Sequence, residues 1–216
     1  MRARLFIALL SAAALAHAAP PAGGIEAAVA AYQRGDLAAA HTAFARLSRA
    51  GIAAADYNLA VMHLRGELPA ASAEAALKLM SRAAEAGFVT AMYGLAQLHE
   101  QGRAGLAVDL VQANRWYRRA AEAGSVDAQV AIGTAHYLGR GAAKDPAQAA
   151  RWFRIAAQGG DVGAQYLVAS MYEAGDGVER DLKEARYWYK VAARNGDVAA
   201  PSKVKELEAR IGVPAT

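Results

Sequence analysis

One block of the sequence returns at intervals of 36 residues. "RWYRRAAEAG" occupies residues 115–124, "RWFRIAAQGG" residues 151–160 and "YWYKVAARNG" residues 187–196. Each copy has an aromatic pair, two consecutive alanines and a closing glycine. A fixed period of this length is typical of stacked repeats, in which each unit buries its apolar faces against its neighbours. The period therefore predicts a chain built from repeated structural units.

A second block precedes each of these and runs from an alanine to a glycine eleven residues later. Its four copies start at residues 55, 91, 128 and 164, with spacings of 36, 37 and 36 residues. The extra residue falls between Gly102 and Asp109, and a connecting segment tolerates an insertion. Four repeats are therefore expected, over residues 55–90, 91–127, 128–163 and 164–200.

Each repeat carries the start and stop signals of two helices. The first helix is expected to end at a glycine, because glycine readily adopts the left-handed conformation found there. These glycines are Gly66, Gly102, Gly139 and Gly175. The second helix is expected to follow an N-cap residue, namely Ser72, Asp109, Asp145 or Asp181. With only six prolines and abundant alanine, the sequence predicts an all-α fold, an α/α solenoid of stacked helix–turn–helix units.

The two blocks together resemble the Sel1-like repeat family, relatives of the tetratricopeptide repeats. The resemblance rests on "AQVAIGTAHYLG" at 128–139, followed by Asp145 and "RWFRIAAQGG" at 151–160. It implies a superhelix that acts as a non-enzymatic scaffold for a protein or peptide partner. Residues 19–54 resemble a degenerate tetratricopeptide-type helix pair. Residues 201–216 are expected to form a capping helix and a tail, because a solenoid must cover its exposed end.

The tryptophans of the second helices are expected to be the main packing residues. Trp116, Trp152 and Trp188 recur at the repeat period beside paired alanines that allow close helix contact. Replacing one of them by alanine would cost about 3–5 kcal/mol if it is fully buried.

Nothing in the sequence predicts a catalytic, metal or cofactor site. The chain has no cysteine and no motif of a nucleophilic, phosphate-binding or zinc-dependent enzyme. His63, His99 and His136 share one position of the repeat. Equivalent positions of packed repeats lie about 10 Å apart, whereas zinc ligands lie within about 2.1 Å of the metal. Half-buried histidines with hydrogen-bond partners are the expected outcome.

The partner is expected in a concave groove lined by the first helices, as the resemblance implies. Three positions of each first helix point away from its alanine-rich face on a helical wheel. The candidate groove residues are Tyr57, Tyr93, Gln97, Glu100, Thr134, Tyr137, Tyr166, Ser170 and Glu173. Exposed tyrosine is typical of interfaces. The alternative is that Tyr57, Tyr93 and Tyr166 pack against the neighbouring repeat, and the sequence leaves both possibilities open.

The second helices carry a cationic face. Its members are Arg115, Arg118, Arg119, Arg151, Arg154, Lys183, Arg186 and Lys190. A solvated face is the simplest interpretation. The alternative is an anionic partner, such as a lipid headgroup or an acidic polysaccharide. The formal charge of +4 is too small to predict nucleic-acid binding.

The first residues have the features of an export signal. Arg2 and Arg4 precede an apolar run, and residues 16–18, "AHA", form a cleavage site before Ala19. Residues 1–18 are therefore expected to direct the chain to a bacterial periplasm and to be removed. No stable membrane insertion is expected after cleavage, because the apolar run is short for a bilayer.

Two other functions remain open at this stage. Cysteine-rich members of the family have been linked to β-lactam binding, so a periplasmic binder or hydrolase of a cell-wall fragment or β-lactam is the alternative. This chain lacks the cysteines of those relatives. The second open possibility is that the first repeat stacks on another chain. The sequence does not predict the oligomeric state.

Overall fold

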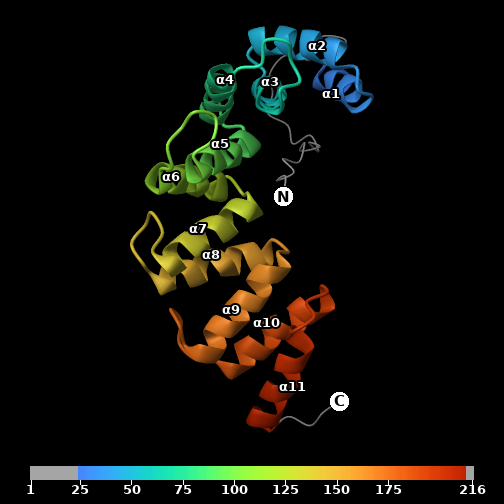
Figure 1. Cartoon of the computed structure of the whole chain (residues 1–216). Coiled ribbons are helices and arrows are strands. Elements are labelled where there is room, and N and C mark those ends of the chain that lie inside the picture. Colours follow the sequence, from blue (N-terminus) through green and yellow to red (C-terminus); the bar gives the residue numbers. More distant parts are fainter. Residues whose placement is uncertain (1–23, 213–216) are drawn as a thin grey trace. The chain divides into compact units, whose positions relative to one another are not determined.

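The computed structural model describes residues 24–212, which form eleven helices and no strand (Figure 1). The expected all-α fold is confirmed. The chain divides into two compact units, unit 1 up to Val108 and unit 2 from Asp109 on. The expected signal peptide, residues 1–18, lies outside the described residues. Along the described chain, no helix is both long and apolar enough to cross a membrane.

Five helices belong to unit 1 and six to unit 2. Unit 1 contains α1 (Ile25–Gln33), α2 (Leu37–Arg49), α3 (Ala53–Arg65), α4 (Ala73–Glu85) and α5 (Val89–Gln101). Unit 2 contains α6 (Leu110–Glu122), α7 (Val126–Leu138), α8 (Pro146–Gln158), α9 (Val162–Ala174), α10 (Leu182–Arg194) and α11 (Ala200–Ile211).

The first helices of the repeats begin two residues before the expected openings. α3, α5, α7 and α9 start at residues 53, 89, 126 and 162, so the period of 36, 37 and 36 residues is kept. Ser125 and Asp161 explain the earlier start of α7 and α9. Their side chains accept hydrogen bonds from the backbone N–H groups of Ala128 (3.3 Å) and Ala164 (2.6 Å), which otherwise lack a partner in the first turn.

The caps of the second helices form as the sequence predicts. Asp109, Asp145 and Asp181 each accept a hydrogen bond from a backbone N–H three residues later, at 2.9–3.1 Å. Ser72 does the same for α4 at 3.2 Å. The glycines that end the first helices have left-handed φ angles between 62° and 77°. Local residue types therefore set both ends of these helices.

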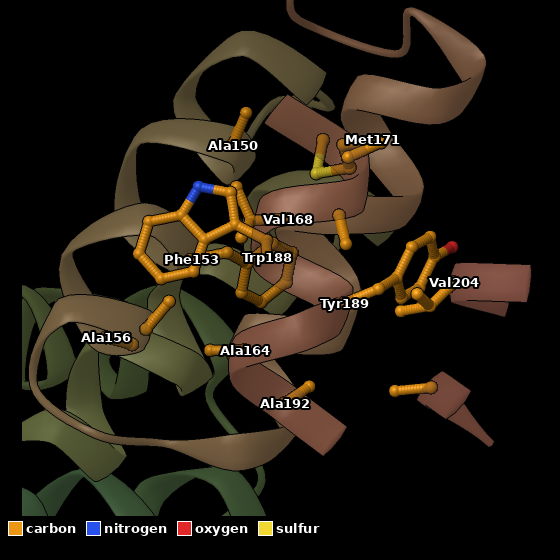
Figure 2. Close-up of a cluster of buried hydrophobic side chains, with 14 of the residues drawn as sticks. Ala150, Phe153, Ala156, Ala164, Val168, Met171, Trp188, Tyr189, Ala192 and Val204 are labelled. Atoms are coloured by element: carbon orange, nitrogen blue, oxygen red, sulfur yellow. The ribbon is translucent and has the colours of Figure 1, made fainter. Parts of the chain in front are cut away.

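Small residues line the core of unit 2 and bring its helices close together. Ala156, Ala164 and Ala192 are fully buried in a cluster that spans α8 to α11. Figure 2 shows the indole of Trp188 directed toward Ala150 and Phe153 of α8, while the ring of Tyr189 points to the other side, beside Val204 of α11. α10 is thus held by aromatic side chains on two faces.

The deepest large residue of each second helix is the one after the tryptophan position. Tyr117, Phe153, Tyr189 and, in α4, Met80 are all buried. Only Trp188 among the tryptophans is as buried as predicted, so the expectation is wrong for Trp116 and Trp152, which are half-buried. Phe153 lies against the backbone of Gly133 in its own repeat, where a Cβ would come within 2.9 Å of the ring. Consecutive residues of a helix point about 100° apart, and Trp188 accordingly points toward α8, the second helix of the preceding repeat.

Hydrogen bonds and an ion pair join the four N-terminal helices of unit 1, α1 to α4. The buried carboxylate of Asp56 on α3 accepts both of its hydrogen bonds from Arg82 on α4, which also donates to Ser48 on α2 (2.6 Å). Tyr32 on α1 donates to Glu67, which follows α3 (2.8 Å). The N-terminal helix pair is thereby fastened to the first repeat.

We predict that Phe153→Ala destabilises the protein by about 3–5 kcal/mol, because it leaves a cavity against Gly133 and the buried alanines. Urea unfolding followed by circular dichroism measures the change. Val198→Ala is the control, since this side chain is almost fully exposed, and it should change stability by less than about 0.5 kcal/mol. Equal effects of the two substitutions would contradict the placement of Phe153.

Candidate functional site

Two tyrosines at the fifth position of the first helices, Tyr57 and Tyr166, pack against aromatic rings that follow them in the chain. Tyr57 is 3% exposed, and its ring centroid lies 5.4 Å from that of Phe88, which precedes α5. Burial raises the pKa of this phenol, so it stays neutral. Tyr57 therefore has no surface to offer a partner, and its assignment to the groove is wrong.

Tyr166 follows the same arrangement in unit 2. Its ring meets that of Tyr189 on α10 edge to face, with centroids 5.0 Å apart. Tyr166 is half-buried, as is Tyr93 at the equivalent position of α5. Tyr57 thus packs next to Gly94 of the following repeat, as the alternative describes, whereas Tyr166 packs on Tyr189 of its own repeat. A helical wheel describes one helix alone, so it does not include the rings of Phe88 and Tyr189 that cover these two tyrosines.

Glu173 is held by the C-terminal helix. Its carboxylate accepts hydrogen bonds from Tyr189 (3.0 Å), from Lys203 of α11 (3.4 Å) and from Arg210 of α11 (2.8 Å). Its side chain is only 15% exposed. The groove position assigned to Glu173 is therefore occupied by a contact within the chain.

The electrostatics of this contact favour the ionised carboxylate. Burial by itself would raise the pKa of Glu173. The hydrogen bonds from Tyr189, Lys203 and Arg210, together with the charge of Lys203, outweigh burial and lower that pKa. Burial and the bond to Glu173 raise the pKa of the Tyr189 phenol. Both groups thus keep the protonation state that fastens α11 to α9.

Solvent reaches the first helices of unit 2 along a different stripe. Positions 2, 6, 9 and 13 of α7 and α9 lie on one side of each helix, since residues four and three apart share a face. Leu138 is 54% and Leu167 40% exposed. We define the first-helix surface of unit 2 as Asp127, Thr134, Leu138, Gly163, Leu167 and Ser170.

The sequence analysis found two members of this surface and missed the others. Thr134 and Ser170 are half-buried on it, whereas Leu138 and Leu167 were not among the candidates. The sequence does contain a signal for the exposure of Leu138. α3 has Arg65 at the equivalent position, and a leucine at a position that is polar in another repeat is not expected to be a packing residue.

The remaining candidates lie outside this stripe. Gln97 and Glu100 are half-buried on α5 in unit 1. Tyr137 is exposed in unit 2, where a hydrogen bond from its phenol to Asp176, and the charge of that carboxylate, raise the pKa of Tyr137. Unit 1 and unit 2 therefore each carry part of the predicted set.

His63 and His136 have hydrogen-bond partners. His63 accepts a hydrogen bond from the N–H of Ser72 (3.2 Å), and burial, with a smaller effect of His41, lowers its pKa. His136 is buried between Arg118 (3.2 Å from its Nε2) and the carbonyl of Ala143 (3.3 Å from its Nδ1). Within residues 24–212, no three or more His, Asp or Glu side chains are grouped so that they could hold a metal ion.

The sequence pattern of the Sel1 repeat matches residues 53–88, 89–125, 126–161 and 162–197. This chain belongs to the Sel1 repeat family. The matched segments start where α3, α5, α7 and α9 start, two residues before the openings inferred from the alanines. No curated protein sequence matches the chain.

Solved structures of two bacterial Sel1 repeat proteins are similar to this one. The first is a protective antigen present in uropathogenic Escherichia coli strains, which displays the same fold; it is 31% identical, with a TM-score of 0.71. The second is a Sel1 repeat protein from Oxalobacter formigenes, 33% identical with a TM-score of 0.72. The matches cover 79% and 78% of this chain but only 36% and 49% of those chains.

Sel1 repeats are typically scaffolds for protein interactions. In this member, the packing of the repeats uses most faces of the first helices, as the burial of Tyr57 shows. The first-helix surface of unit 2 and the exposed arginines of α6 and α8 remain accessible.

We predict that Glu173→Gln lowers stability at pH 7 by about 1–2 kcal/mol, because three hydrogen bonds to a charged acceptor are weakened. The pKa of Glu173 is lowered by folding, so its contribution is complete above about pH 5.5 and is lost as the pH falls through the folded value. The difference between wild type and variant should therefore shrink below about pH 4.5. Urea unfolding at pH 7, 5 and 3.5 tests this.

Glu122→Gln is the matched control, since it removes an exposed carboxylate elsewhere in unit 2. It should leave stability almost unchanged at each pH. A Glu173→Gln effect that is the same at pH 7 and pH 3.5 would show that the carboxylate does not hold α11.

Proposed function

We propose that this Sel1 repeat protein is a non-enzymatic scaffold that binds a protein or peptide partner on the first-helix surface of unit 2. The proposal rests on one observation: Leu138 and Leu167 are exposed on helices whose other faces are buried in packing. A half-exposed leucine contributes less to the stability of the free protein than a buried one. Burial of its exposed surface in a complex contributes favourable free energy to binding. Thr134 lies one turn from Leu138 on α7, and Ser170 lies one turn from Leu167 on α9. The Thr134 hydroxyl donates to the carbonyl of Val130 (2.8 Å) and can still accept a hydrogen bond.

The mixture of residues on this surface suits a partner that binds and dissociates. Interfaces of this kind combine an apolar centre with a polar rim. Asp127 supplies a charged group at the start of the α7 stripe. The partner class is therefore a protein or peptide with an apolar segment.

We further propose that the protein acts in the periplasm of a bacterium. Residues 1–18 support this, with two arginines, an apolar run and small residues at 16 and 18. The two similar solved structures come from bacterial proteins.

A photoreactive amino acid at position 170 should crosslink the partner in intact cells, because Ser170 lies on the first-helix surface. The same residue at position 198 is the control, since Val198 is exposed outside this surface. Combining the probe at 170 with Leu138→Ser and Leu167→Ser should lower capture about tenfold, as expected for loss of two apolar contacts.

The thermal unfolding midpoint of the doubly substituted protein should stay close to that of the wild type, because both leucines are exposed. Capture that persists at its original level without the two leucines, or that arises only from position 198, would refute the assignment of this surface.

For export, cell fractionation should find a protein that starts at Ala19 in the periplasm. Ala18→Arg should block removal of residues 1–18, because the cleavage site requires a small residue there. N-terminal sequencing distinguishes the two forms. A full-length protein in the cytoplasm of wild-type cells would contradict the proposal.

A further inference from the structure

Two pockets of the same construction lie in successive repeats of unit 2. The first has a volume of about 460 Å³ and lies between α6 and α7; the second, of about 170 Å³, lies between α8 and α9. Arg115 and Arg118 flank the first pocket, and Arg151 and Arg154, 36 residues later, flank the second. The pockets are thus a product of the repeat.

The floor and the lip of each pocket are well packed. Ile132 and Val168, both fully buried, form the floors. Gly141 and Gly177 form the lips, with left-handed φ angles of 66° and 71°. A Cβ at Gly141 would lie 2.5 Å from the carbonyl oxygen of Leu110, so this loop rests directly on the start of α6. The pockets are therefore built into the fold.

The arginines beside the pockets have no anionic partner among the residues that the structure describes. Arg115, Arg118, Arg119, Arg151 and Arg154 are all exposed, and no carboxylate of residues 24–212 forms an ion pair with them. α6 and α8 together contain a single acidic residue, Glu122. The two helices therefore present a surplus of positive charge around an apolar hollow.

The next repeat has a cation at the position of these arginines, and that cation forms an ion pair. Lys190 on α10 is equivalent to Arg118 and Arg154 at the 36-residue period, and its Nζ lies 2.7 Å from a carboxylate oxygen of Glu208 on α11. Glu208 in turn is equivalent to His136 and Tyr172. These two residues supply no carboxylate, so at the α6 and α8 pockets the counter-charge is missing from the wall.

We infer that the α6 and α8 pockets bind an acidic peptide segment of a partner protein, with carboxylates on the arginine pairs and an apolar side chain in the hollow. Carboxylates form strong bidentate hydrogen bonds with guanidinium groups. Val111, 52% exposed at the rim of the first pocket, and Ile132 beneath it favour an apolar side chain between the charges.

The spacing of the pockets suits an extended chain. Neighbouring repeats stack at about 8–10 Å, which is about three residues of an extended peptide at about 3.3 Å each. This second-helix site is separate from the first-helix surface, so the two proposals can fail independently.

The test begins with selection of a displayed library of random 12-residue peptides on the full-length protein at low salt. Enriched peptides should be acidic and contain an apolar residue between or beside the acids. Their affinity, measured by fluorescence anisotropy, should fall about tenfold in the Arg118→Gln, Arg154→Gln double variant. The matched control, Arg34→Gln with Arg49→Gln, removes the same charge from exposed sites in unit 1 and should change affinity less than twofold.

A second variant tests the missing counter-charge without removing an arginine. Tyr172→Glu places a carboxylate where α11 has Glu208, so it should pair with Arg154 and weaken peptide binding several-fold. Circular dichroism confirms that each variant is folded.

Several results would overturn the inference. Enriched peptides without an acidic bias would overturn it. An equal loss of peptide affinity in the two double variants would also overturn it, because it would indicate unspecific charge attraction. Tighter, Arg118- and Arg154-dependent binding of phosphatidylglycerol vesicles or of polygalacturonate would assign the site to a membrane or to an acidic polysaccharide instead.

Discussion

The close contact of alanine-faced helices is the constraint on which this structure depends. Ala156, Ala164 and Ala192 are fully buried, and each belongs to a different helix of unit 2. Such helices approach closely but bury little surface each, so one pair could not be stable alone. Large side chains such as Phe153 and Trp188 fill the spaces that alanine leaves, one within a repeat and the other between repeats (Figure 2).

Stacking also determines which polar groups are available for binding. A helix that follows a first helix can cover its tyrosine, as Tyr189 of α10 covers Tyr166 of α9. At the end of unit 2, α11 takes up both Glu173 on α9 and the cations of α10. The positions that remain accessible in unit 2 include a stripe of α7 and α9 and the arginines of α6 and α8.

Much of the fold could be predicted from the sequence, because its signals are local. Asp109, Asp145 and Asp181 cap the second helices through their own side chains, and the glycines after the first helices take the left-handed conformation that ends them. The candidate site could be predicted only in part. Thr134 and Ser170 were found, but Tyr57 and Glu173 were assigned to a surface from which packing removes them.

The sequence by itself therefore determined the number of helices in each repeat, the ends of the first helices, the starts of the second helices and the family, since caps and period are properties of neighbouring residues in the chain. The tertiary structure decided which side of each helix meets solvent. That choice depends on the helix that packs next to it, and Tyr57 is buried only because Phe88 and α5 lie against α3. It also decided that Lys190 has a carboxylate partner while Arg154, its equivalent, has none among residues 24–212, because Glu208 comes from a helix that only folding brings into contact.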